Sequence, residues 1–253
     1  MITPFSDHFS KLACCYSDRP DYPEELFEHI ATLAPSHGRV WDAGTGGGQA
    51  AVRLARYFDE VVATDASLEQ IKAARRHPKV RYAVVPSESS GLPERAFDAV
   101  TAAQALHWFA LEPFYREVRR VLKPGGLLAV WCYGFESVDE RVDLVTRKLY
   151  SDFLRQFWPE RTVKDYTYDA LELPFDELPR RMFRMEMVWT LGQFISSLRT
   201  YSASRYYKEQ NGVDPLNLLA GEFGEAWGDP QQPRLVTWPV YSRYAVVATD
   251  GAA

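Results

Sequence analysis

The sequence predicts an α/β fold in which a mostly parallel β-sheet carries helices on both faces. From residue 20 to about residue 132, short apolar segments alternate with segments of helical spacing. Short, nearly continuous apolar runs are typical of parallel strands that are buried on both faces. Turns rich in glycine or proline, at 44–48 and 123–126, separate these elements.

The first half of the chain is expected to supply five strands. A helix over 21–34 precedes them, with Asp21 as its N-cap, Pro23 early in the helix and a break at 34–38. The expected strands are 39–42, 60–65, 80–85, 97–103 and 127–132, and the helices between them are 49–58, 68–76 and 112–122.

The pattern changes after residue 133. Residues 135–180 are acidic and aromatic, and they are expected to be helical. No internal repeat or low-complexity segment is visible, and a single domain over 1–253 is expected. The remaining expected elements are strands at 183–190 and 241–249 and helices at 192–202 and 215–227.

The composition is that of an ordinary soluble chain. Its 253 residues include 29 Lys and Arg against 34 Asp and Glu, so its charge does not favour nucleic acid. No segment resembles a signal peptide or approaches the roughly 20 apolar residues of a membrane span, so a cytoplasmic protein without a membrane partner is expected. Cys14, Cys15, Cys132 and five scattered histidines form no ligand pattern, so neither a disulfide framework nor a metal site is expected.

The segment 40–48, VWDAGTGGG, ends an expected strand in a glycine-rich turn that opens a helix. Glycines in such a turn let backbone N–H groups approach a ligand closely. The dinucleotide fingerprint GxGxxG would place a third glycine after Gly44 and Gly46 at position 49, where this chain has Gln49. The spacing is instead DxGxGxG, and a carboxylate at Asp42 opposes a pyrophosphate but suits a cation.

A second acidic residue narrows the class of ligand. Asp65 ends the second expected strand, 21 residues after Gly44, where a carboxylate can accept both hydroxyls of a ribose. The alternative is that Asp65 only caps the next helix. A ligand with a ribose and an amino group, and without phosphates, fits both Asp42 and Asp65.

These motifs resemble those of the class I S-adenosylmethionine-dependent methyltransferases, in particular the methyltransferase type 11 group and its trans-aconitate methyltransferase-like branch. The resemblance implies a Rossmann-like, seven-stranded, mostly parallel sheet with an antiparallel last strand. It also implies S-adenosyl-L-methionine as the cofactor. It covers nearly the whole chain and rests on DAGTGGG (42–48), VVATD (61–65), FDAVTAAQALHWF (97–109), RVLKPGGLLAVW (120–131) and SLRTYSA (197–203).

The resemblance further implies which residues bind the cofactor. Asp42 and the backbone at Ala43, Gly44 and Gly46 would hold the methionine moiety, while Asp65 would bind the ribose.

Two other positions are implied by the same resemblance. Gln104, at the end of the fourth strand, would face the methionine moiety. Ser87 or Glu88 lies where adenine is usually contacted. Because many relatives carry Gly-Asp-Ala where this chain has 85–88, VPSE, contact through backbone groups alone is the alternative.

His107 and Arg199 are the candidate catalytic residues. His107 either lies beside the transferred methyl group or packs under Trp108. Arg199 either pairs with a substrate carboxylate through its guanidinium fork or lies in solvent. A carboxylate acceptor needs a cation such as Arg199, whereas a phenol or amine benefits from a base such as His107.

Aromatic residues are expected to shape the pocket. Tyr16 and Tyr22 belong to an N-terminal flap over 1–22, which would close over the cofactor together with the 135–180 insertion. Trp108 is assigned to the substrate pocket, and Trp131 and Tyr133 are either pocket wall or core.

The function expected is methyl transfer to a small molecule by in-line displacement, with a carboxylate oxygen favoured as the acceptor. A non-catalytic protein that binds S-adenosylmethionine or S-adenosylhomocysteine is the first alternative. A nicotinamide-dependent oxidoreductase is the second, and the glycine spacing argues against it. Methylation of a macromolecule has no support from a basic face, and the sequence does not indicate an oligomeric state.

Overall fold

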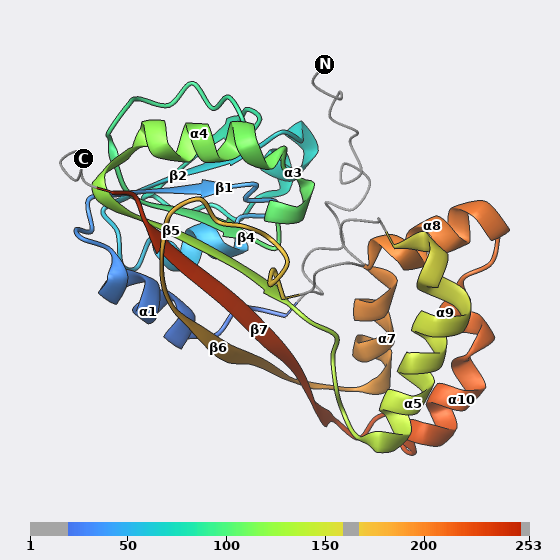
Figure 1. Ribbon diagram of the computed structural model, residues 1–253. Helices are drawn as coiled ribbons and strands as arrows, with labels where there is room; N and C mark the ends of the chain where they lie inside the picture. Colours follow the sequence, from blue (N-terminus) through green and yellow to red (C-terminus); the bar gives the residue numbers. More distant parts are fainter. Residues whose placement is uncertain (1–19, 159–166, 249–253) are drawn as a thin grey trace.

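The computed structural model describes residues 20–158 and 167–248. A seven-stranded sheet with the order β3-β2-β1-β4-β5-β7-β6 forms its centre (Figure 1). Strands β1 to β5 pair in parallel, and β7 is antiparallel to both of its neighbours, which confirms the predicted Rossmann-like fold. The strands are β1 (Arg39–Ala43), β2 (Glu60–Asp65), β3 (Val80–Val84), β4 (Phe97–Ala103), β5 (Leu122–Tyr133), β6 (Asp176–Trp189) and β7 (Arg234–Val246).

Helices cover both faces of the sheet, as the sequence predicted. Helices α1 (Glu24–Leu33) and α2 (Gln49–Leu54) pack on one face, in a core that contains Phe27 and Trp131. Helix α4 (Leu111–Val121) packs on the other face, in a core that contains Trp41 and Phe114. The short helix α3 (Leu68–Ala73) contacts β2 and β3.

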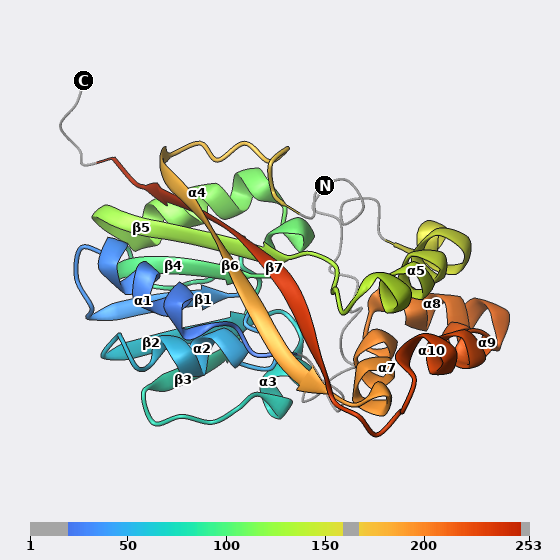
Figure 2. The same ribbon diagram turned by 90° about the horizontal axis from the view of Figure 1, so that it is seen from below.

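The remaining helices gather into a separate layer, here called the helical unit (Figures 1 and 2). It follows the ends of β5 and β6 in the chain, so it lies at the carboxyl ends of those strands, the edge where open α/β sheets bind ligands. Its helices are α5 (Glu140–Lys148), the π-helical turn η3 (Leu149–Leu154), the 3-10 turn η4 (Arg155–Phe157), α7 (Leu191–Arg199), α8 (Ser202–Asn211), α9 (Pro215–Leu218) and α10 (Ala220–Trp227). None of the described helices has the length and apolar character needed to cross a membrane.

Asp21 does not cap the first helix, contrary to the prediction. Helix α1 begins at Glu24, its N-cap is Pro23, and no side chain caps it. The carboxylate of Asp21 instead lies 2.9 Å from Arg75 and 3.4 Å from Arg53, because these guanidinium groups offer it a stronger partner than a backbone amide. Residues 1–19 of the expected flap, which include Tyr16, lie outside the described residues.

The predicted helical character of 135–180 is correct only in part. Among the described residues of this segment, the helices end at Phe157, and β6 already begins at Asp176 rather than at 183. This strand lies at the edge of the sheet, and only Met185 and Trp189 of its residues are buried. Because most of its side chains face solvent, its first half lacks the apolar pattern that marks a strand.

A buried hydrogen bond between β1 and β2 offers a test of the core. The indole Nε1 of Trp41 donates to Thr64 Oγ1 at 2.8 Å, and both side chains are fully buried. The change Thr64→Val leaves the indole N–H without an acceptor, so we expect the free energy of unfolding to fall by about 1–3 kcal/mol in urea titrations. Thr237→Val, in a more exposed part of β7, is the control and should change it by less than about 0.5 kcal/mol. Equal effects of both changes would contradict a specific role for the indole bond.

Candidate functional site

The glycine turn after β1 lies between the ends of β2 and β4. Gly44, Gly46 and Gly48 have φ angles of 68°, 52° and 76°, which residues other than glycine rarely adopt. A Cβ atom at Gly44 would lie 2.8 Å from Ala105 Cβ and 2.9 Å from the Phe109 ring. Glycine is therefore required there by both the backbone conformation and the packing of the segment after β4.

Asp42 lies beneath this turn and is fully buried. Its Oδ2 accepts a hydrogen bond from Thr45 Oγ1 at 2.5 Å, and its Oδ1 accepts one from Thr101 Oγ1 at 2.8 Å. Burial raises the pKa of Asp42 to about 6, the two hydroxyls act in the opposite direction, and the charge of Asp65 raises the pKa further. The geometry shows Asp42 holding the turn in place, and its contact with the methionine moiety stays a prediction.

Asp65 stands at the carboxyl end of β2, beside the turn. Its Oδ2 accepts from the backbone N–H of Gly46 at 2.9 Å, and its Oδ1 accepts from that of Ser67 at 2.8 Å. The N-cap of α3 is Ser67, whose hydroxyl accepts from Gln70 N, so capping is not the role of Asp65. Its half-buried carboxylate is an acceptor of the kind that the hydroxyls of a ribose need, and its contact with the ribose stays a prediction.

Gln104 joins the ends of β4 and β5. Its φ is 51°, its backbone N–H donates to Trp131 O at 2.8 Å, and its Oε1 accepts from Tyr133 N at 2.9 Å. The residue therefore shapes the edge of the sheet beside the glycine turn, and its contact with the cofactor stays a prediction.

The aromatic residues assigned to the pocket are mostly buried. Trp131 is fully buried and packs edge-on against Tyr22 and Phe27, at ring-centre distances of 5.6 and 6.1 Å, which favours core over pocket wall. Tyr22 and Tyr133 are each 8% exposed and lie next to one another, and only Trp108 of the four is half-buried.

His107 lies in the 3-10 turn η2 (Leu106–Trp108), which follows β4. Its half-buried ring contacts those of Trp108 and Tyr168, at ring-centre distances of 5.1 and 6.1 Å, and its Nδ1 lies 3.1 Å from the Tyr168 hydroxyl. Burial lowers the pKa of His107 to about 4, so the imidazole is neutral at pH 7. The packing against Trp108 that the sequence offered as one alternative is present, and contact with the methyl group stays a prediction.

The residues after β3 face the start of α4. Ser87 is buried, and Glu88 Oε1 accepts a hydrogen bond from the backbone N–H of Ala110 at 2.9 Å. The Glu88 side chain thus links two loops at the carboxyl edge, and the adenine contact predicted for either residue stays a prediction.

Arg199 ends α7 and binds within the helical unit. Its Nε lies 2.9 Å from Asp214 Oδ2, and its Nη2 donates to Asn217 Oδ1 at 3.0 Å. The guanidinium group that was assigned to a substrate carboxylate is therefore bound by a carboxylate and an amide of this chain. The predicted substrate role would require this ion pair to open.

Sequence reasoning missed four polar residues of this region, namely Thr45, Thr101, Tyr168 and Arg243. The two threonines could have been suspected, because a buried carboxylate at Asp42 needs hydroxyl or amide partners. Tyr168 and Arg243 carry no motif and meet the site only through the fold. Within 20–158 and 167–248, no group of three or more His, Cys, Asp or Glu side chains could hold a metal ion.

Comparison with known proteins identifies the family. Residues 41–130 match the family model described as a methyltransferase domain. A Dictyostelium discoideum protein named as a methyltransferase is 31% identical over 220 residues, which span 85% of this chain and 84% of that protein. The yeast protein CRG1, named as an S-adenosylmethionine-dependent methyltransferase, is 30% identical over 124 residues, covering 46% of this chain and 43% of CRG1.

A solved structure is similar over nearly the whole chain. It is described as a type II methyltransferase from Anaeromyxobacter dehalogenans, and it matches with a TM-score of 0.85 and 41% identity, covering 91% of this chain and 99% of the other. The chain therefore belongs to the class I S-adenosylmethionine-dependent methyltransferases, and S-adenosylmethionine is its cofactor.

The residues at the carboxyl edge fit this cofactor. The glycine turn lies beside Asp65, whose carboxylate is an acceptor of the kind that a ribose needs and binds the amide of Gly46. Asp42 adds a negative charge beneath the turn, which suits a ligand that carries an amino group.

The buried carboxylate of Asp42 predicts an unusual pH dependence of stability. Its pKa in the folded state, about 6, lies above the ordinary value of 3.8, so the folded protein binds the proton more tightly than the unfolded chain between about pH 4 and 6. As the pH rises from about 4 to about 7, the wild type should lose on the order of 2–3 kcal/mol of stability relative to Asp42→Asn, and most of the loss should fall below pH 6. Urea unfolding of both proteins from pH 4 to 7 measures this difference.

Asp98→Asn is the control for this measurement. Asp98 is also buried, which raises its pKa, but the Lys123 ammonium at 2.6 Å and other hydrogen bonds lower it below 3.8 on balance. The stability difference between the wild type and Asp98→Asn should therefore stay level from pH 4.5 to 7 and change only at lower pH. A level difference for Asp42→Asn as well would show that Asp42 titrates normally.

Proposed function

We propose that this methyltransferase acts on a small molecule and transfers the methyl group to a carboxylate oxygen. The observation that carries the proposal is His107, a neutral imidazole in contact with Trp108 and Tyr168 after the end of β4. A base with a pKa of about 4 removes a proton from a phenol or an amine poorly at pH 7. A carboxylate is already ionised at that pH and needs no base.

The chemistry that S-adenosylmethionine supplies when bound is an electrophilic methyl group on a sulfonium sulfur. The protein's part is to orient the acceptor and to exclude water. The glycine turn and Asp65 would bind the cofactor, the neutral His107 would contact the acceptor, and Trp108 would border it. The helical unit follows the strand ends at this edge, so it can enclose a small acceptor.

Charge and shape support a small acceptor over a macromolecule. The chain carries a formal net charge of -5, which does not attract a nucleic acid. The aromatic side chains of Tyr22, Trp108 and Tyr133 suit an acceptor with an apolar body beside its carboxylate. The cation that the sequence offered for such a carboxylate, Arg199, is bound by Asp214, so the proposal assigns the contact with the acceptor to His107 in its place.

Cofactor binding is the first test. Calorimetric titration of the wild type with S-adenosylmethionine and S-adenosylhomocysteine should give micromolar dissociation constants, and Asp65→Asn should raise them at least about tenfold, because a charged acceptor for the ribose is lost. Glu69→Gln, an exposed acidic position on α3 close to Asp65 in the chain, is the control and should change them less than about twofold. Equal binding by wild type and Asp65→Asn would remove Asp65 from the cofactor site.

Turnover and its pH dependence test the acceptor. Incubation with small carboxylic acids and methyl-labelled cofactor should give methyl esters, with kcat/KM level from about pH 7 to 9, because His107 and the acid have pKa values near 4 and Asp42 has one of about 6. A rate that rises with pH, on phenols or amines instead, would contradict the proposal. Cofactor binding without turnover on any acceptor would favour the non-catalytic alternative.

A further inference from the structure

Tyr168 is a buried polar residue that the proposed reaction does not yet use. Its side chain is only 1% exposed, and its hydroxyl lies 3.1 Å from Nδ1 of His107. It belongs to the segment 167–175, which precedes β6 and packs against the α4 face of the sheet through Tyr168 and Leu173. Sixty-one residues separate Tyr168 from His107, so the fold alone brings them together.

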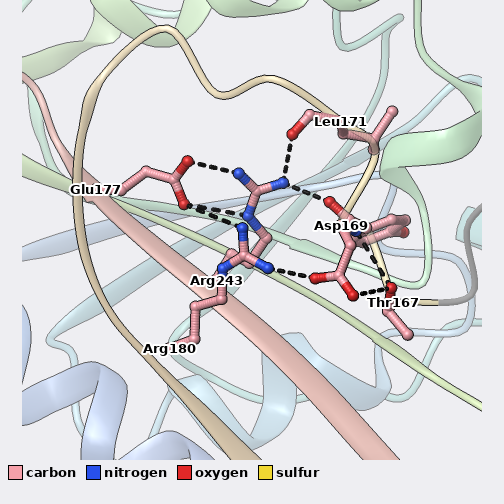
Figure 3. A network of polar contacts seen from close by, with 7 residues as sticks. Thr167, Asp169, Leu171, Glu177, Arg180 and Arg243 are labelled. Atoms are coloured by element: carbon pink, nitrogen blue, oxygen red, sulfur yellow. Dashed lines mark hydrogen bonds and ion pairs between the residues drawn. The ribbon is translucent and has the colours of Figure 1, made fainter.

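Arg243 of β7 holds the backbone of this segment (Figure 3). Its guanidinium is 2% exposed and donates to the carbonyl oxygens of Tyr168 and Leu171. It also donates to both carboxylate oxygens of Glu177, at 2.6 and 3.2 Å. An ion pair between Arg180 of β6 and Asp169 also binds this segment to the sheet.

The backbone of Tyr168 is itself unusual. Its φ is 59°, in the left-handed region, which bulky residues adopt only where the surrounding structure enforces it. The contacts of Arg243 supply that enforcement, and they fix the direction in which the Tyr168 ring leaves the chain. These contacts therefore hold the Tyr168 hydroxyl at Nδ1 of His107.

The surroundings of the hydroxyl indicate which partner donates. Burial raises the pKa of Tyr168, so its hydroxyl keeps its proton at pH 7. Among the described residues the hydroxyl has no hydrogen-bond partner besides Nδ1 of His107, and a buried O–H without an acceptor is costly, so the hydroxyl donates to Nδ1. A neutral imidazole that accepts at Nδ1 carries its own proton on Nε2.

We propose that Tyr168 is a positioning residue that fixes His107 as the Nε2–H tautomer, so that the imidazole offers the methyl acceptor a hydrogen-bond donor and not a base. Nε2 makes no hydrogen bond to any of the described residues, and the proposal assigns its proton to the methyl acceptor. The inference rests on the proposed carboxylate acceptor, since an N–H donor binds and orients an ionised oxygen.

Nuclear magnetic resonance tests the tautomer without any turnover. Long-range proton–nitrogen correlation spectra of protein labelled at its histidines distinguish Nε2–H from Nδ1–H, and His107→Gln identifies the His107 signals among the five histidines. The wild type should show Nε2–H alone from pH 6 to 8. In Tyr168→Phe the nitrogen shifts should move toward the average of a mixture of the two tautomers.

Tyr115→Phe is the matched control. Tyr115 is a buried tyrosine on the same face of the sheet, and its hydroxyl has no hydrogen-bond partner among the residues that the structure describes. Its removal should leave the His107 signals unchanged. On a carboxylic acid that gives turnover, Tyr168→Phe should lower kcat/KM at least about tenfold, while the dissociation constant for S-adenosylmethionine changes less than about twofold. Tyr115→Phe should change neither.

The outcomes separate this inference from the proposed function. An Nδ1–H tautomer in the wild type, or an Nε2–H tautomer that persists unchanged in Tyr168→Phe, overturns the role of Tyr168 even if carboxylic acids are methylated. The expected spectra without methylation of any carboxylic acid would support Tyr168 as the determinant of the tautomer and count against the acceptor instead.

Discussion

The buried carboxylate of Asp42 is the interaction on which the site depends. It lies where β1 ends, and its two oxygens are bound by Thr45 of the turn and Thr101 of β4. A buried carboxylate without partners is costly, so these two bonds fix the turn and the two strands in one relative position. The amide of Gly46 is thereby placed at the carboxylate of Asp65, which closes the turn against β2.

The parallel half of the fold could be predicted because its signals are local. β2 and β4 have the bounds that the apolar runs predicted, 60–65 and 97–103, since strands buried on both faces leave unbroken apolar segments. The edge strand β6 was predicted several residues too late, because burial at Met185 and Trp189 alone is too sparse to mark a strand. Asp21 was misread for a related reason, since its ion pairs with Arg53 and Arg75 are contacts between distant residues.

The same division applies to the site. The glycines of the turn and Asp65 lie together in the structure, because a strand, a turn and a helix in sequence fix their own geometry. The link from Arg243 to the backbone of Tyr168 spans 75 residues, and the link from Tyr168 to His107 spans 61. No spacing rule predicts such contacts, because they depend on the position of β7 beside β5 and on the packing of the segment before β6 against the sheet.

Three buried ionisable side chains help to hold segments outside the sheet in position. Asp42 binds the glycine turn, and Arg243 binds the segment before β6. Glu136, just after β5, accepts hydrogen bonds from the hydroxyls of Tyr150 and Tyr201 and so binds the helical unit to the end of that strand. Segments outside a sheet lack its ladder of backbone hydrogen bonds, and a buried charge tolerates only the few arrangements that satisfy it. These polar contacts therefore fix the positions of the segments at the carboxyl edge of the sheet. Fixed positions are what the alignment of an acceptor with a methyl group requires.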